Sequence, residues 1–139
     1  MAAAGIFVVD CSVSIAWLFE QQADAYTEAA LDALVGRYAV APRWWHVEVL
    51  NVLLALERRA RLGTGEAVEL LRLMQGLPVR LQESRSSVFE LHALALRHQL
   101  TAYDALYLET ALSTGLPLAT RDKALQRAAI ECGVGVWTA

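Results

Sequence analysis

The chain has 139 residues, of which 56% are hydrophobic and 19% are charged, and its formal net charge is −3. This composition excludes an intrinsically disordered chain, and the length suits a single domain over residues 1–139. A pI near 5.6 excludes a protein that binds nucleic acid through bulk positive charge. The mean hydropathy of +0.36 is higher than a small monomer needs, which points to an apolar surface for a partner.

We expect neither a membrane span nor a secretion signal. No apolar stretch approaches the roughly 18 residues of a membrane span. The apolar start of the chain lacks the basic residues of a signal peptide and runs directly into Asp10. Cys11 and Cys132 are far apart and form no C-x-x-C motif, so we expect two reduced thiols. These features predict a cytoplasmic protein.

The chain is predicted to alternate between strands and helices. In its first half the sequence predicts, in order, a strand over 5–9, helices over 12–19 and 23–35, a strand over 38–40 and a helix over 42–60. Pro42 is expected to open that long helix, because a proline in the first turn loses no hydrogen bond. Gly36 and Gly63 stand where the preceding helices should end.

The second half continues the same alternation. It predicts helices over 64–74, 87–98, 101–114 and 122–132, with strands over 79–81, 116–120 and 134–136. Alternating strands and helices imply an α/β fold with a mainly parallel sheet and helices on both faces. In such sheets a ligand binds beyond the carboxyl ends of the strands.

Four carboxylates stand where strands are predicted to lead into helices. Asp10 closes the first apolar run, and Asp122 follows the predicted strand over 116–120. Glu48 and Asp104 lie near the starts of strong helical patterns. Acids that converge at the strand ends of one small domain predict a site for a divalent cation.

The aspartates also have purely structural explanations. Asp10 or Ser12 would serve as the N-cap of the first helix, and Asp122 as the N-cap of the last. Thr101 and Asp104 match the pattern of a capping box. Taken singly, capping explains each aspartate about as well as a metal does.

Glu48 also has a structural explanation, since it could be a solvent-exposed residue on a long helix. It nevertheless lies between Val47 and Val49 and shares a helical face with Asn51. An acid near a core-facing stripe needs a partner, because burying an unpaired charge is costly. A shared cation would meet this need for all four acids. Ligands that are all oxygen favour Mg²⁺ or Mn²⁺ over zinc, and the spacing of the three histidines forms no metal pattern.

Four short motifs carry a resemblance to a known family. They are Val-Val-Asp-Cys-Ser at 8–12, Glu-Val-Leu-Asn at 48–51, Thr-Ala-Tyr-Asp-Ala at 101–105 and Ala-Thr-Arg-Asp at 119–122. In this order they resemble the PIN-domain ribonucleases, and most closely the VapC-type toxins of bacterial type II toxin–antitoxin pairs. The resemblance covers residues 6–136. It implies a Rossmann-like PIN domain, an α/β/α sandwich, that cleaves RNA endonucleolytically with Mg²⁺, for which Mn²⁺ is expected to substitute.

The resemblance also assigns roles to individual residues. It implies an acidic metal site of Asp10, Glu48, Asp104 and Asp122, supported by Ser12, Asn51 and Thr120. It further implies a homodimer and a cognate protein antitoxin, with the predicted helices over 23–35 and 64–74 as candidate contact surfaces. No residue names the RNA target.

Two groups of cations are candidates for contacts with RNA phosphates. The first lies near the expected mouth of the site and consists of Arg43, Arg121, Lys123 and Arg127. The second is a denser cluster at a helix end, made of Arg58, Arg59 and Arg61, and interaction with the helix C-terminus explains it better.

Two other functions fit parts of the pattern. A metal-dependent phosphohydrolase or receiver-like phosphoacceptor domain also places acids at strand ends. A receiver needs an acidic pair after the first strand and a late lysine, whereas Cys11 and Ser12 follow Asp10 here and no lysine lies in the matching context. A non-catalytic PIN scaffold is the other alternative, but it has no need to keep four mutually repelling acids.

Overall fold

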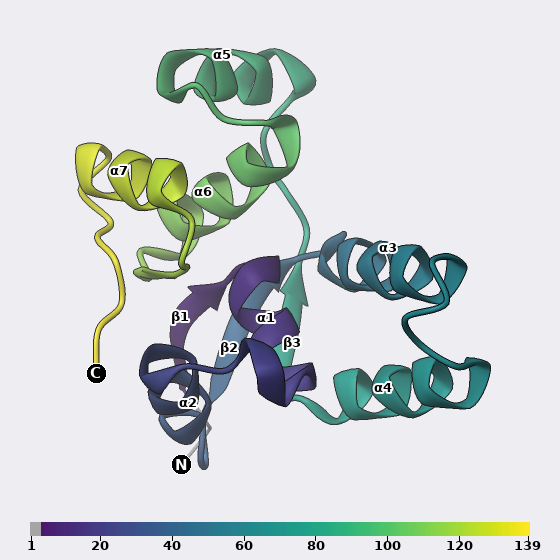
Figure 1. Cartoon of the computed structure of the whole chain (residues 1–139). Coiled ribbons are helices and arrows are strands. Elements are labelled where there is room, and N and C mark those ends of the chain that lie inside the picture. The colour runs from purple at the N-terminus through teal and green to yellow at the C-terminus, as the bar shows by residue number, and fades with distance from the viewer. Residues whose placement is uncertain (1–3) are drawn as a thin grey trace.

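A computed structural model describes residues 4–139 (Figure 1). The elements follow in the order β1 (Gly5–Val9), α1 (Cys11–Leu18), a 3₁₀ turn η1 (Glu20–Gln22), α2 (Ala25–Asp32), β2 (Tyr38–Pro42), α3 (Trp45–Arg58), α4 (Thr64–Gly76), β3 (Val79–Gln82), α5 (Val88–His98), α6 (Ala102–Thr114), β4 (Leu118–Ala119) and α7 (Lys123–Glu131). The first three residues of the expected domain lie outside the described residues.

The four strands form one parallel sheet in the order β3-β2-β1-β4. Val8 of β1 pairs with Val40 of β2 on one side and with Leu118 of β4 on the other. From β1 the chain therefore winds outward through β2 and β3, then returns to add β4 at the opposite edge of β1. This reversal lies between β1 and β4, which is where a ligand cleft forms in open α/β sheets. The predicted α/β fold with a parallel sheet is confirmed.

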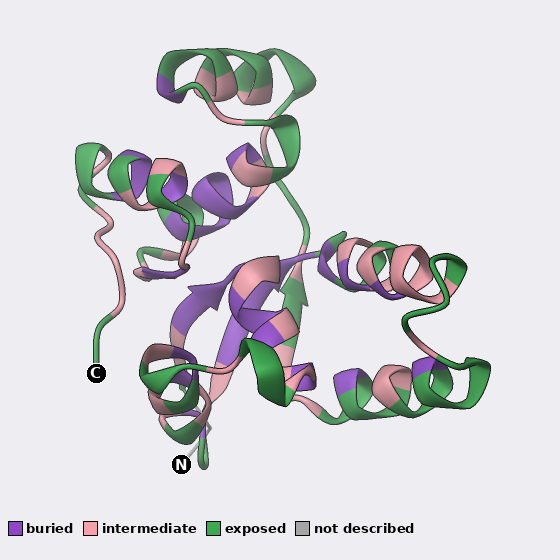
Figure 2. Ribbon diagram, in the orientation of Figure 1, coloured by how far each residue is buried: buried purple, intermediate pink, exposed green. Residues whose placement is uncertain are grey.

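Helices flank the sheet and bury its strands. Helix α6 packs against β1, β2 and β4 and carries α5 on its other side, whereas α1 packs against α2, α3 and α4. Figure 2 shows the strands largely buried, with exposed residues on α4 and α5. In β1, Phe7, Val8 and Val9 are all fully buried. Because successive side chains of a strand point to opposite faces of the sheet, both faces of β1 are covered by apolar residues. Such continuous apolar runs are typical of strands covered on both faces.

The structure corrects three predicted boundaries. Pro42 ends β2 instead of opening a helix, because its strand still pairs with β3 through Pro42 and Gln82, and α3 begins only at Trp45. The second helix begins at Ala25, where the Asp24 side chain forms a capping box with Thr27. The predicted last strand is reduced to a single bridge between Leu118 and Val136. The short turn η1 had no predicted counterpart.

Within residues 4–139, every helix falls short of the length and apolarity that crossing a membrane requires.

Candidate active site

Asp10 is the most firmly held acid of the site. It is 4% exposed and sits at the junction of β1 and α1, where its Oδ1 accepts hydrogen bonds from the Ser12 hydroxyl at 2.7 Å and the Val13 amide at 3.1 Å. Its Oδ2 accepts a hydrogen bond from the Thr120 hydroxyl. Burial raises the pKa of the Asp10 carboxyl, although these three hydrogen bonds oppose the shift. Asp10 is therefore both the N-cap of α1 and a buried carboxyl whose charged form is disfavoured by burial.

Thr120 links the two strands that border the switch point. It is fully buried just after β4, and its hydroxyl also accepts a hydrogen bond from the Asp122 amide at 3.0 Å. Asp122 is exposed and caps α7 by accepting from the Leu125 amide at 2.8 Å. The capping explanations of Asp10 and Asp122 are thus confirmed. Capping does not remove these acids from the site, because the same strand ends bring them together.

Glu48 and Asp104 approach the same place from two helices. Glu48 lies in the first turn of α3 and Asp104 in the first turn of α6, and both are half-buried. Burial raises the pKa of Glu48, and the charges of Asp104 and Asp10 raise it further. Burial also raises the pKa of Asp104, with a second contribution from the charge of Asp122. Asp10, Asp104 and Asp122 each contribute a charge that raises the pKa of another acid of the four.

Thr101 forms only half of the expected capping box. Its hydroxyl accepts a hydrogen bond from the Asp104 amide at 3.1 Å and so caps α6. Within residues 4–139 the Thr101 amide does not donate the second hydrogen bond of a capping box to the Asp104 side chain. The Thr101 hydroxyl nevertheless lies close enough to the Asp104 carboxyl to lower its pKa, although burial and the charge of Asp122 outweigh this effect.

Two residues of the site were not singled out from the sequence. Tyr107 lies one helical turn after Asp104, is 1% exposed, and its hydroxyl has no hydrogen-bond partner among the described residues. That hydroxyl faces the Glu48 carboxyl closely enough to lower its pKa, but not in the geometry of a hydrogen bond. Cys11 also borders the acids, and burial together with the charges of Glu48, Asp10 and Asp104 raises the pKa of its thiol to about 12. The (i, i+3) spacing of Asp104 and Tyr107 was the available signal for the tyrosine.

The chain resembles known proteins in sequence and in fold. A family model of the PIN domain matches residues 7–131. The chain belongs to the PIN domain family. Among solved structures it is similar to PAE2754 from Pyrobaculum aerophilum, with a TM-score of 0.68 and 24% identity over 90% of this chain and 86% of that chain. At this identity the likeness shows the fold alone. The search of curated proteins gave no match.

PIN domains are generally nucleases that use divalent metals, and the donors of this PIN domain fit such an ion. The acids provide hard oxygen ligands, and the Tyr107 hydroxyl is an unpaired buried donor beside one of them. In residues 4–139, however, no three histidine, cysteine or acidic side chains stand close enough together to hold a metal. Glu48 and Asp104 would therefore have to move toward Asp10 to share one ion with it.

Most of the cations expected to bind RNA form hydrogen bonds or ion pairs with other residues of this PIN domain. The Arg121 guanidinium donates to the carbonyl oxygens of Ser12 and Gln22, both at 2.8 Å, and pairs with Asp24 at 3.3 Å. Arg43 pairs with Glu83, and the Arg127 Nε lies 3.9 Å from Glu131. Lys123 is exposed in the first turn of α7 and forms no ion pair within the described part of the chain. Arg121 therefore links the loop before α7 to α1, and these contacts use most of the hydrogen-bond donors of its guanidinium group.

Removing the Tyr107 hydroxyl should weaken metal binding without lowering the stability of the metal-free protein. In the Tyr107→Phe variant we expect the metal-free protein to be at least as stable as the wild type, because a buried hydroxyl without a partner contributes nothing to the fold. We expect Mn²⁺ affinity to fall about 10-fold, since the residues that orient metal ligands commonly contribute that much. Thermal unfolding and Mn²⁺ titration measure the two effects. A less stable variant with unchanged Mn²⁺ affinity would contradict this role.

Proposed function

We propose that this PIN domain is a Mg²⁺-dependent endoribonuclease and the toxin of a type II toxin–antitoxin pair, similar to VapC. The observation that carries the nuclease proposal is the group of four acids at the switch point between β1 and β4, three of them with a raised pKa. Charges that raise each other's pKa in a partly buried site favour a cationic ligand. The resemblance of the motifs to VapC-type toxins supports the finer assignment.

In this proposal each acid has a distinct task. Asp10 is the fixed ligand, because three hydrogen bonds hold its carboxylate while leaving part of its lone pairs free. Glu48 and Asp104 are the adjustable ligands, and Asp122 adds negative charge at the exposed edge. A bound divalent cation lowers the pKa of a coordinated water and neutralises charge on the scissile phosphate. Without the cation the carboxylates repel the phosphate, so RNA binding and cleavage should both depend on the metal.

The nuclease proposal is tested with labelled single-stranded RNA at neutral pH. The expected result is endonucleolytic cleavage in Mg²⁺ or Mn²⁺, products with 5′-phosphate and 3′-hydroxyl ends, and no cleavage in EDTA. Sequencing of fragment ends after expression of the chain would identify the target. Cleavage that is equally fast in EDTA would rule out a metal-dependent centre, and folded protein that cleaves no RNA would favour the non-catalytic scaffold.

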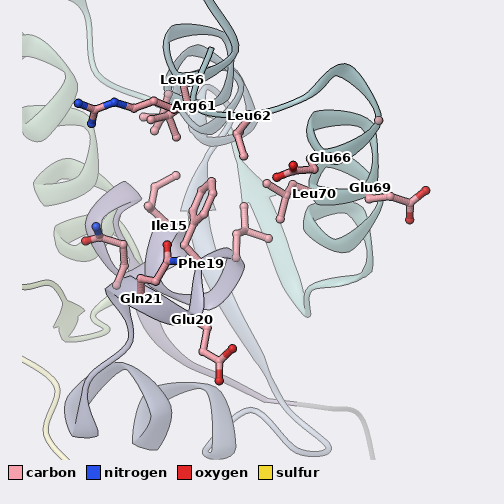
Figure 3. A pocket seen from close by; sticks show the side chains of 14 residues that line it. Ile15, Phe19, Glu20, Gln21, Leu56, Arg61, Leu62, Glu66, Glu69 and Leu70 are labelled. Carbon is pink, nitrogen blue, oxygen red and sulfur yellow. The ribbon is translucent and has the colours of Figure 1, made fainter. Parts of the chain in front are cut away.

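A large groove offers a surface for the proposed antitoxin. Its volume is about 1180 Å³, and its walls are formed by α1 and η1 on one side and by α3 and α4 on the other (Figure 3). Ile15, Phe19 and Leu70 point into it, and its rim carries Glu66 and Glu69. An apolar floor with an acidic rim fits an amphipathic, basic segment of a partner. Of the two helices expected to contact an antitoxin, α4 lines this groove and α2 does not.

Co-expression with the proposed cognate antitoxin would test this surface. Leu70→Glu should prevent co-purification of the antitoxin and should leave the RNase activity of the isolated chain unchanged, because Leu70 lies away from the four acids. Leu70→Met keeps the apolar contact and should still bind. Retention of the antitoxin by Leu70→Glu would exclude the groove. Analytical ultracentrifugation would test the proposed homodimer, and a monomer at micromolar concentration would contradict it.

A further inference from the structure

A second hollow borders the acidic centre and is flanked by two exposed aromatic rings. It measures about 780 Å³ and is lined by residues of the starts of α3 and α6, namely Trp44, Val47, Glu48, Asn51, Val52, Ala102, Tyr103 and Leu106. Trp44 is 55% exposed and Tyr103 is 59% exposed. Glu48 belongs both to this hollow and to the acidic centre. A ligand that fills the hollow therefore reaches the place where the acids converge.

Trp44 differs from every other tryptophan of the chain. Trp17 donates to the Thr27 carbonyl at 2.8 Å, and Trp45 is 4% exposed and donates to the Ser14 hydroxyl at 2.7 Å. Trp137 packs against Phe7 with ring centroids 5.0 Å apart. Trp44 is the N-cap residue of α3, yet its side chain forms no hydrogen bond within residues 4–139. The fold gives it no partner that would explain so large an exposed apolar ring.

Positive charge around the centre is sparse, since Lys123 is the one expected cation there that forms no ion pair within residues 4–139. Arg43, Arg121 and Arg127 are engaged by Glu83, Asp24 and Glu131 respectively, and the chain as a whole carries a net charge of −3. A protein of this charge needs another source of affinity for RNA. Stacking of unpaired bases on aromatic rings is such a source, and it does not depend on positive charge.

We propose that the hollow between Trp44 and Tyr103 binds an unpaired nucleobase of single-stranded RNA, and that the Asn51 amide on its lining is a hydrogen-bonding group for the edge of that base. The proposal rests on the nuclease function proposed above and defines its substrate as single-stranded. A base held here places its neighbouring phosphate toward Glu48 and the other acids. A duplex cannot enter in this way, because its bases remain stacked within the helix.

Fluorescence anisotropy with a labelled, random-sequence, single-stranded 12-nucleotide RNA tests this inference, with Ca²⁺ replacing Mg²⁺ and RNA integrity checked on a gel. Trp44→Ala and Tyr103→Ala should each weaken binding roughly 10- to 100-fold, which corresponds to the loss of one stacked base. Trp44→Phe and Tyr103→Phe keep a ring and should stay within about 3-fold of the wild type. Phe89→Ala removes an even more exposed aromatic ring from α5 and should have no effect.

Three outcomes would overturn the inference. One is wild-type affinity in both alanine variants while the wild type cleaves RNA in Mg²⁺, which leaves the nuclease function standing. Another is that the alanine substitutions weaken the binding of a 12-base-pair RNA duplex as much as they weaken the binding of the single strand. The last is dissociation of a dimer by Trp44→Ala or Tyr103→Ala with unchanged RNA affinity, which would make this face a contact between two copies. Absence of cleavage by the wild type would instead count against the nuclease proposal.

Discussion

Replacing Asp104 with asparagine is expected to lower the rate of metal-dependent RNA cleavage at least about 100-fold, since even the partners of metal ligands contribute roughly 10- to 100-fold. The same change should make the metal-free protein more stable at pH 7. Burial and the charge of Asp122 raise the Asp104 pKa above 3.8, so the environment disfavours the charged form despite the helix N-terminus. A raised pKa in the folded state means that stability present at low pH is lost as the pH rises through that pKa.

Two comparisons make the Asp104→Asn result specific. Asp32→Asn removes one exposed carboxylate from the end of α2 and should change neither cleavage nor metal-free stability. The stability gain of Asp104→Asn should disappear near pH 3, where the wild-type carboxyl is itself neutral. An activity equal to that of the wild type in a folded Asp104→Asn variant would remove Asp104 from the site. A loss of metal-free stability at pH 7 would show that its charge supports the fold.

Replacing Thr120 with valine should have the largest effect on folding. The Thr120 hydroxyl is fully buried, donates to the Asp10 carboxylate and accepts from the Asp122 amide. Valine has a similar shape but neither bond, so a buried charge loses one of its three donors. The expected cost is about 1–3 kcal/mol in the free energy of unfolding. Because this hydrogen bond lowers the Asp10 pKa, the cost should be greatest at pH values above that pKa and should shrink as Asp10 is protonated.

Urea unfolding at several pH values measures the effect of Thr120→Val. Thr120→Ser retains the hydroxyl and should recover most of the stability, so a similar loss in both variants would assign the effect to packing. In the Asp10→Asn background the cost of Thr120→Val should be smaller, because the acceptor no longer carries a charge. An unchanged cost in that background would mean that the hydroxyl does not act through Asp10.

The acids could be found from the sequence because their positions follow from local rules. Asp10 comes directly after an apolar strand, Asp122 follows one within three residues, and both cap the helix that follows, so periodicity places them at the carboxyl edge of a parallel sheet. The β3-β2-β1-β4 order then makes β1 and β4 neighbours and brings them together through Thr120. Alternating elements predict a parallel sheet, but not which strand lies beside which.

Other features depended on contacts that no sequence pattern contains. Trp44 and Trp45 are adjacent, yet one is 55% exposed and the other 4% exposed, and the misplaced start of α3 hid this difference. Tyr107 looked like one more apolar residue of α6, since only the packing of α3 against the site turns its hydroxyl into a neighbour of Glu48. Arg121 was expected to face RNA, but its partners lie about one hundred residues earlier in the chain.

Calorimetric titration of Mn²⁺ into the metal-free protein at pH 7 tests most directly whether the four acids form a metal centre. We predict saturable binding by the wild type and by Asp32→Asn, and binding at least about 100-fold weaker in Asp104→Asn. We also predict that the wild-type affinity falls below neutral pH, because the raised pKa values of Asp10, Glu48 and Asp104 let protons compete with the metal. Folded wild-type protein that takes up no Mn²⁺ at millimolar concentration, or an Asp104→Asn variant that binds it as tightly as the wild type, would contradict the account.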